Sequence, residues 1–306
     1  MNRIFDRKII LEDGTEFYGY GFGAKRDALV ELVFNTSIVG YQEILSDPSY
    51  TAQAVVMTYP LIGNYGMCNE DYETDIPTIS GLVVREFNSE PSNFRAARTL
   101  EDVMIQYDIV GIAGVDTRRH IRDEGTCKAL IVDAQTPSIA CLAKMRSTAL
   151  PTNQVSVVST KSPWISACAN PKHRVVAVDC GIKHNIIRSL NARGCEVTIV
   201  PWTVTVEEVM AMHPDGLFIS NGPGNPEDAK PVIDLVRALR GKMPIFGICL
   251  GHQIIALAYG ASTYKLKFGH RGGNHPVKNL QTGKVEITSQ NHSYAVKADS
   301  LAGTGL

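Results

Sequence analysis

The residue that most plainly suggests chemistry is Cys249, which ends an apolar run between two glycines. In the segment Pro244-Ile-Phe-Gly-Ile-Cys-Leu-Gly251, Gly247 and Gly251 stand two positions before and after the cysteine. A nucleophile on a tight strand-to-helix turn leaves no room for a Cβ at those positions, and the dipole of the following helix favours a thiolate. A cysteine in such a run can also be a buried structural residue. Because strand, glycines and helix agree, the spacing predicts a nucleophile, though esterases use the same elbow.

A second glycine-rich turn, Ser220-Asn-Gly-Pro-Gly-Asn-Pro226, ends the strand expected before the elbow. Glycines without side chains let a substrate approach backbone amides closely, as an oxyanion hole requires. The candidate donors are the N–H groups of Gly222 or Gly224, together with that of Leu250. By itself the turn is also compatible with an ordinary Pro-Gly loop.

The second half of the chain alternates between apolar strands and amphipathic helices, which predicts a parallel sheet covered on both faces. Ligands of such sheets bind at the carboxyl ends of the strands, where both glycine-rich turns lie. The expected strands cover residues 174–181, 195–202, 215–224 and 243–251, and the expected helices cover 183–194, 205–214, 226–242 and 252–261.

The first half has a different texture, with short β-rich runs separated by turn residues. We expect a mixed α+β domain over residues 1–150, with one helix over 92–107. Strands are expected at 8–14, 31–37, 54–60, 80–87 and 107–116. Residues 151–172 are rich in proline and small polar residues and predict an interdomain linker before a domain over 173–306.

Composition narrows the functional classes. Of the 306 residues, 44% are hydrophobic and 20% charged, and the net charge of -1 favours neither nucleic acid nor a membrane surface as partner. The N-terminal residues fit neither a signal peptide nor a membrane span, which predicts a cytoplasmic location. The seven cysteines form no CxxC pair, so neither a disulfide framework nor a metal site is expected.

Together, FISNGPGNP and PIFGICLGHQIIALAYGA resemble the class I glutamine amidotransferases, in which a cysteine attacks the side-chain amide of glutamine and releases ammonia. Further segments resemble the small subunits of carbamoyl phosphate synthetases in particular, and this resemblance spans nearly the whole chain. They are FNTSIVGYQEILSDPSYTAQ (34–53), TYPLIGNYG (58–66), VDTRRHIR (115–122), FGHRGGNHPV (268–277) and SQNHSYAV (289–296).

The resemblance implies a glutamine site that draws on both halves of the chain, with a pocket at the domain interface. The family's glutamine contacts fall on Ser49, Gly222, Gly224, Leu250, Gln253, Asn291, Ser293 and Tyr294. Family members often have glycine where Ser293 stands and phenylalanine where Tyr294 stands. Contacts through the backbone would tolerate both changes.

A cysteine glutaminase also needs a histidine base oriented by a carboxylate, which this family carries in a His-Pro-Glu stretch near its C-terminus. None of the eight histidines stands in that pattern. His213-Pro-Asp precedes the elbow and is a poor candidate, and His292 fits a pocket position better than a base. We therefore expect the sequence to be C-terminally truncated and its glutaminase turnover to be very low.

The resemblance implies a partner as well. Carbamoyl phosphate synthesis needs ATP, yet the sequence has no GxxxxGK[ST] loop and no GxGxxG that opens a helix. ATP and Mg²⁺ are therefore expected on the large synthetase subunit, which would use the ammonia for arginine and pyrimidine biosynthesis. Two alternatives stay open: a regulatory or scaffold subunit without catalysis, and an esterase or peptidase built on the same elbow.

Overall fold

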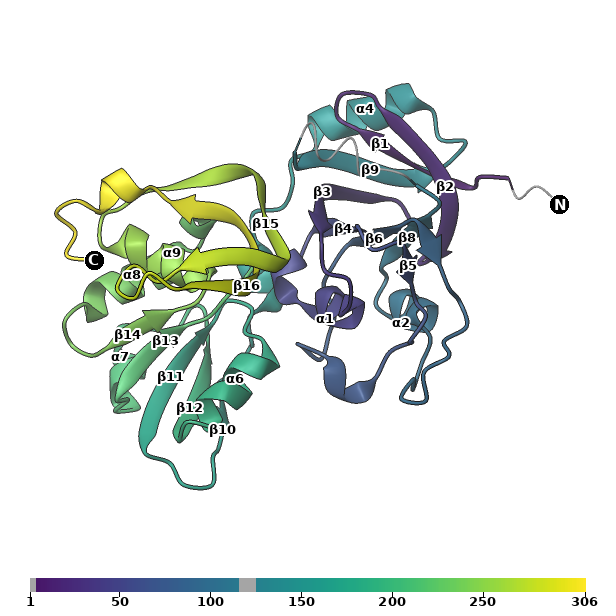
Figure 1. Cartoon of the computed structure of the whole chain (residues 1–306). Coiled ribbons are helices and arrows are strands. Elements are labelled where there is room, and N and C mark those ends of the chain that lie inside the picture. Colours follow the sequence, from purple (N-terminus) through teal and green to yellow (C-terminus); the bar gives the residue numbers. More distant parts are fainter. Residues whose placement is uncertain (1–3, 116–124) are drawn as a thin grey trace. The chain divides into compact units, whose positions relative to one another are not determined.

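The computed structural model describes residues 4–115 and 125–306, which fall into two compact units (Figure 1). The first unit comprises Met1–Pro151 and Lys267–Asn291, and the second comprises Thr152–Leu266 and His292–Leu306. Each unit has hydrophobic clusters of its own, as expected of separate folding domains.

The first unit is built on a closed barrel with the strand order β1-β2-β8-β6-β4-β3-β9. Neighbours within β3, β4, β6 and β8 run parallel, whereas β1 and β9 pair antiparallel with their neighbours. This confirms the mixed domain expected from the sequence. The barrel strands are β1 (Arg7–Leu11), β2 (Glu16–Gly23), β3 (Ala28–Asn35), β4 (Gln53–Met57), β6 (Gly81–Val84), β8 (Val110–Ala113) and β9 (Cys127–Asp133). Two further strands, β5 (Leu61–Ile62) and β7 (Glu86–Phe87), form a separate two-stranded sheet.

Among the described residues of the first unit, the α-helices are α1 (Tyr41–Ser46), α2 (Leu100–Gln106) and α4 (Ser138–Ser147). The prediction of one helix over 92–107 was wrong for its first half. The hydroxyl of Thr99 accepts a hydrogen bond from the amide of Asp102 at 3.0 Å, which caps the helix so that it begins only at Leu100. Before this cap, the side chain of Asn93 accepts from the amide of Arg95 and folds residues 93–95 into a turn.

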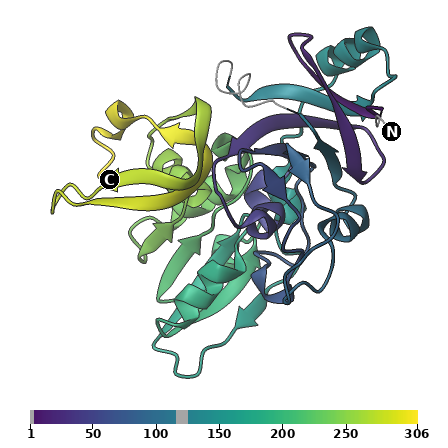
Figure 2. The same cartoon turned by 45° about the vertical axis from the view of Figure 1, so that its right-hand side comes forward.

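The second unit holds a five-stranded sheet with the order β10-β12-β11-β13-β14, seen from two directions in Figures 1 and 2. The four strands β12, β11, β13 and β14 are parallel, as predicted. They cover β11 (His173–Asp179), β12 (Cys195–Pro201), β13 (Gly216–Ile219) and β14 (Ile245–Gly247), and the helices are α6 (His184–Asn191), α7 (Val206–Ala211), α8 (Lys230–Leu239) and α9 (Leu250–Ala258).

Alternate residues of the central strand β11 pack on opposite faces of this sheet. Val176 and Val178 join the cluster that contains residues of α7, α8 and α9, whereas Ala177 joins the cluster that contains residues of α6. Helices therefore cover both faces, which confirms the doubly wound arrangement expected from the alternation of strands and helices.

The segment 151–172, predicted as a linker, contains two short elements. They are α5 (Gln154–Val158) and β10 (Trp164–Ser166), and β10 pairs antiparallel with β12 at the edge of the sheet. Elements of this length are too short to show a hydrophobic period, so periodicity could not indicate them.

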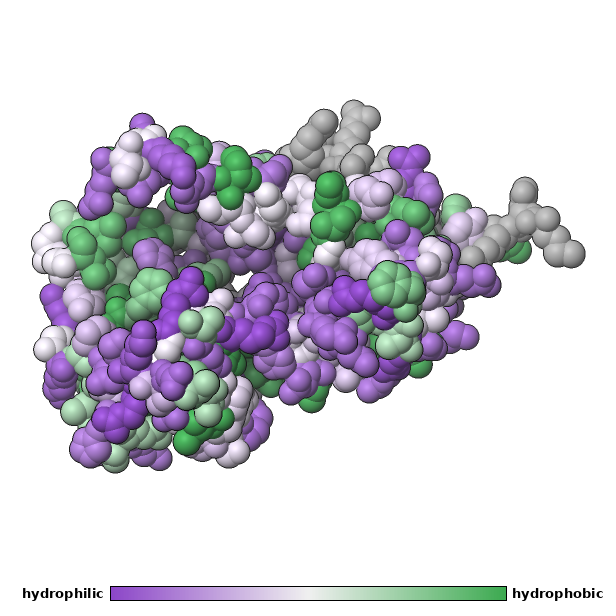
Figure 3. Space-filling model, turned by 60° about the horizontal axis from the view of Figure 1, so that its bottom comes forward, coloured by the Kyte–Doolittle hydropathy of each residue, from purple (hydrophilic) through white to green (hydrophobic). Residues whose placement is uncertain are grey.

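Two long strands, β15 (Thr263–Lys278) and β16 (Val285–Val296), pair with each other, and each includes residues of both units. The face drawn in Figure 3 is mainly hydrophilic, with hydrophobic residues scattered among the polar ones. In the ranges 4–115 and 125–306, no helix combines the length and apolar character needed to cross a membrane.

Candidate active site

The predicted elbow forms a strained turn between β14 and α9. Cys249 is half-buried and has φ 54° and ψ -107°, a backbone conformation that a residue with a Cβ rarely adopts. The amide of Ile248 donates to the carbonyl of Ile219 at 3.2 Å, and the amide of Gly251 donates to that of Ile248 at 2.9 Å. These bonds tie the turn to β13 and hold the cysteine at the first turn of the helix. Strain of this kind is typical of functional sites.

Both flanking glycines are required by close approaches of the backbone. A Cβ on Gly247 would lie 2.5 Å from the carbonyl carbon of Gly251, and one on Gly251 would lie 2.1 Å from the carbonyl oxygen of Ile219. Neither distance is compatible with a side chain, because these neighbours are backbone atoms that cannot rotate away. The steric reason inferred from the sequence is therefore present in the structure.

The second glycine-rich turn lies beside the start of α9. A Cβ on Gly222 would lie 2.8 Å from the Cδ2 atom of Leu250, and Gly224 has φ +88°, which favours glycine. Leu250 is the first residue of α9, so helix geometry gives its amide no intrahelical acceptor. The amides named as oxyanion donors thus belong to two segments that lie against each other, and one of them, Leu250, directly follows Cys249.

Gln253 and Tyr294, two further residues expected at the site, are joined directly. The Nε2 atom of Gln253 donates to the carbonyl oxygen of Tyr294 at 2.6 Å, and the amide of Gln253 donates to the carbonyl of Cys249 at 3.1 Å. The Nδ1 atom of His292 lies 2.8 Å from the same Tyr294 oxygen. The second unit therefore links the stretch 292–294, which includes Ser293, to the first turn of α9.

The remaining expected residues, Ser49 and Asn291, lie in the first unit and share one partner, Asp47. One carboxylate oxygen of Asp47 accepts from the amide of Ser49 at 2.9 Å, and the other accepts from the side-chain amide of Asn291 at 3.1 Å. Asp47 is only 3% exposed. Sequence reasoning missed it, although an aspartate before Pro-Ser is a typical cap of a short turn.

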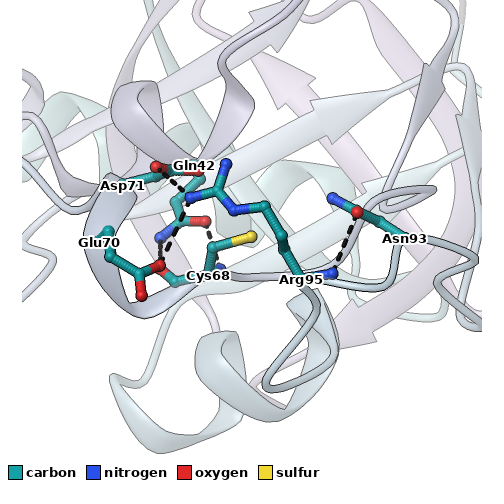
Figure 4. Close-up of polar contacts among 6 residues, drawn as sticks. All are labelled: Gln42, Cys68, Glu70, Asp71, Asn93 and Arg95. Carbon is teal, nitrogen blue, oxygen red and sulfur yellow. Dashed lines mark hydrogen bonds and ion pairs between the residues drawn. The ribbon is translucent and has the colours of Figure 1, made fainter.

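Helix α1, which leads into Asp47, is anchored by the side chain of Gln42 (Figure 4). The side chain of Gln42 accepts from the amide of Cys68 at 2.7 Å and donates to the carbonyl of the same residue. Near Cys68, Arg95 pairs with Asp71 at 2.9 Å and with Glu70 at 3.4 Å. Exposed ion pairs of this kind contribute little stability, so the buried clamp made by Gln42 is the stronger anchor.

Comparisons with known proteins find matches for both halves of the sequence. Residues 9–131 match the family model of the carbamoyl-phosphate synthase small chain, CPSase domain, and residues 176–305 match that of the glutamine amidotransferase class-I family. A carbamoyl phosphate synthase small chain of Fusobacterium nucleatum subsp. nucleatum is 52% identical over 306 residues, or 99% of this chain and 85% of that relative. The chain belongs to the carbamoyl-phosphate synthase small chain family.

Other relatives agree with this membership. Carbamoyl phosphate synthase small chains of Staphylococcus saprophyticus and Bacillus caldolyticus are each 50% identical over 303 residues. Both alignments cover 98% of this small-chain family member, and 82% and 83% of the respective relatives. The resemblance drawn from the motifs is therefore confirmed over almost the whole chain.

The fold also decides whether His213 can serve as a base for Cys249. His213 lies just before the amino end of β13, whereas Cys249 follows the carboxyl end of β14, which runs parallel to β13. The two residues therefore lie at opposite edges of the sheet, which excludes His213 as a base for Cys249. Of the motif at 115–122, residues 116–122 lie outside the described residues. Among the residues that are described, no group of three or more His, Cys, Asp or Glu side chains could hold a metal ion.

Proposed function

We propose that this chain is the glutamine-hydrolysing subunit of a carbamoyl phosphate synthase and that Cys249 is its nucleophile. The observation that carries the proposal is the strained backbone of Cys249, at φ 54°, on an elbow between β14 and α9. A structural cysteine needs no such conformation. The matches to the small-chain family and to the class-I glutamine amidotransferases support glutamine as the substrate.

In the proposed reaction, the Cys249 thiolate attacks the side-chain carbonyl carbon of glutamine. The amides of Leu250 and of Gly222 or Gly224 hold the negative charge that develops on the oxygen, and such a donor contributes about 3 to 4 kcal/mol to the transition state. The C–N bond then breaks as the amide nitrogen takes up a proton, equivalent to the one lost when the Cys249 thiol ionised, and ammonia leaves with a γ-glutamyl thioester on the cysteine. Water attacks this thioester and releases glutamate and the thiol.

The other expected residues hold the substrate. Gln253, Ser293 and Tyr294 would contact glutamine from the side of α9, and Ser49 and Asn291 would do so from the residues around Asp47. The direct bond between Gln253 and Tyr294 and the shared partner of Ser49 and Asn291 support two preorganised sets of contacts.

The ammonia would pass to a large subunit that binds ATP and Mg²⁺, and the resulting carbamoyl phosphate would serve arginine and pyrimidine biosynthesis. The names of the relatives as small chains support such a partner. The comparisons give no support to the alternative of a purely regulatory or scaffold subunit.

The proposal is tested with a chloroketone analogue of glutamine, whose carbon forms a C–S bond with the nucleophile as chloride leaves. Peptide mapping should find the label on Cys249, and glutamine should protect against it. Cys195→Ser is a matched control, because Cys195 is also a half-buried cysteine of the second unit. Cys195→Ser should be labelled as wild type, whereas labelling that persists in Cys249→Ser would refute the assignment.

A further inference from the structure

We infer that Asp179 is a positioning residue that fixes the oxyanion loop through the turn 180–182. This inference rests on the proposed function, because it concerns how the amide of Gly222 or Gly224 is held for glutamine. Asp179 is the last residue of β11, so its turn lies at the same edge of the parallel sheet as the loop after β13 and the elbow after β14.

Asp179 is 6% exposed, and its carboxylate is bonded to backbone donors. One oxygen accepts from the amides of Gly181 at 2.9 Å and Ile182 at 2.8 Å, and the other accepts from the amide of Thr160 at 2.7 Å. The side chain thus ties the turn 180–182 to the segment that carries Thr160. Three charge-assisted bonds hold that turn more firmly than a single neutral acceptor could.

The turn held by Asp179 lies directly against the oxyanion loop. A Cβ on Gly222 would lie 2.0 Å from the carbonyl oxygen of Cys180, and one on Gly181 would lie 3.2 Å from the Cα of Gly222. The amide of Cys180 also donates to the hydroxyl of Ser220 at 2.9 Å. Because these contacts join backbone to backbone or to a short side chain, a shift of the turn moves Gly222.

Burying the charged carboxylate of Asp179 at this position costs free energy of folding. Burial raises the pKa of Asp179, and the amides of Ile182, Thr160 and Gly181 only oppose that rise. An acid in such a place is therefore best explained by the number of amides that it organises. Asparagine keeps the size of the side chain but has one acceptor oxygen, so its NH₂ group would face a backbone N–H.

The test compares two reagents that both modify Cys249 in Asp179→Asn. Reaction with the chloroketone analogue of glutamine passes through an oxyanion at the carbonyl, whereas alkylation by iodoacetamide does not. We expect the limiting inactivation rate with the chloroketone to fall by about 10-fold or more, with half-saturation changed less than about threefold. The alkylation rate with iodoacetamide should stay within about twofold of wild type.

Two further variants make the test decisive. Asp215→Asn changes an aspartate that also accepts a backbone amide, that of Arg174, but at the amino end of the strands, and it should react as wild type. Gly181→Ala disturbs the same turn without touching the carboxylate, at φ +123°, and should reproduce the Asp179→Asn pattern even if Asp179→Asn fails to fold.

The outcomes separate the two ideas. Wild type that is not labelled at Cys249 refutes the proposed function. The role of Asp179 is overturned if wild type is labelled and both Gly181→Ala and any folded Asp179→Asn react with the chloroketone as fast as wild type. It is also overturned if the variants are slowed alike with both reagents.

Discussion

Replacing Gly251 with alanine should misplace the start of α9 relative to Cys249. The added Cβ would lie 2.1 Å from the carbonyl oxygen of Ile219, and real Cβ contacts are essentially never closer than 3.0 Å. Relief of the clash therefore requires a movement of about 0.9 Å, the difference between these two distances. A displacement of about 1 Å can lower a rate about 100-fold when reacting groups must be aligned.

The rate to measure is inactivation by the chloroketone analogue of glutamine, together with thermal unfolding. Gly251→Ala should slow inactivation by about 100-fold and lower the free energy of unfolding by about 1 to 3 kcal/mol, the usual cost of overpacking. Gly216→Ala is the matched control, because Gly216 opens β13 and a Cβ there would meet its nearest atom, the carbonyl oxygen of Pro244, at 3.4 Å. This control should react at the wild-type rate.

If Gly251→Ala is inactivated at more than half of the wild-type rate, the elbow does not depend on the close contact with β13. The steric reasoning for both flanking glycines would then be wrong. A large loss of stability without a change in inactivation rate would lead to the same conclusion.

Two further predictions concern buried aspartates. Asp47→Asn leaves one acceptor for the two donors of Ser49 and Asn291, so the half-saturating concentration of the chloroketone should rise about 10-fold, and an unchanged value would contradict a role in glutamine binding. Burial raises the pKa of Asp179, so the carboxyl binds its proton more tightly in the folded chain. The resulting stability is present below pH about 4 and is lost as pH rises through the raised pKa. The free energy of unfolding of wild type minus that of Asp179→Asn should therefore decrease from pH about 4 to neutral pH, and urea titrations that show an increase would contradict this.

Much of the fold could be predicted because hydrophobic periodicity reports directly on long, regular elements. The strands that became β11 and β12 and the helices that became α6 and α8 follow from it closely. The start of α2 could not be predicted this way, because a hydrogen bond accepted by the single hydroxyl of Thr99 decides where the helix begins. The same limit applies to β10, whose three residues are held by pairing with β12 rather than by their own pattern.

The site was predictable where chemistry constrains local sequence. Gly247 and Gly251 indicated the elbow, because close backbone contacts exclude a side chain at these two positions, two residues before and after Cys249. Asp47 and Asp179 act on residues brought near by the fold, and no local spacing indicates this. Sequence reasoning therefore proposed the groups that contact glutamine and missed the aspartates that bind their neighbours.

The central claim is that Cys249 attacks glutamine itself. The most direct measurement is acid quenching of the protein after brief incubation with radiolabelled glutamine, followed by peptide mapping. We predict a γ-glutamyl thioester on the peptide that carries Cys249, absent in Cys249→Ser and present in Cys195→Ser. Radiolabel on another residue, or an acid-stable label that persists in Cys249→Ser, would contradict the account.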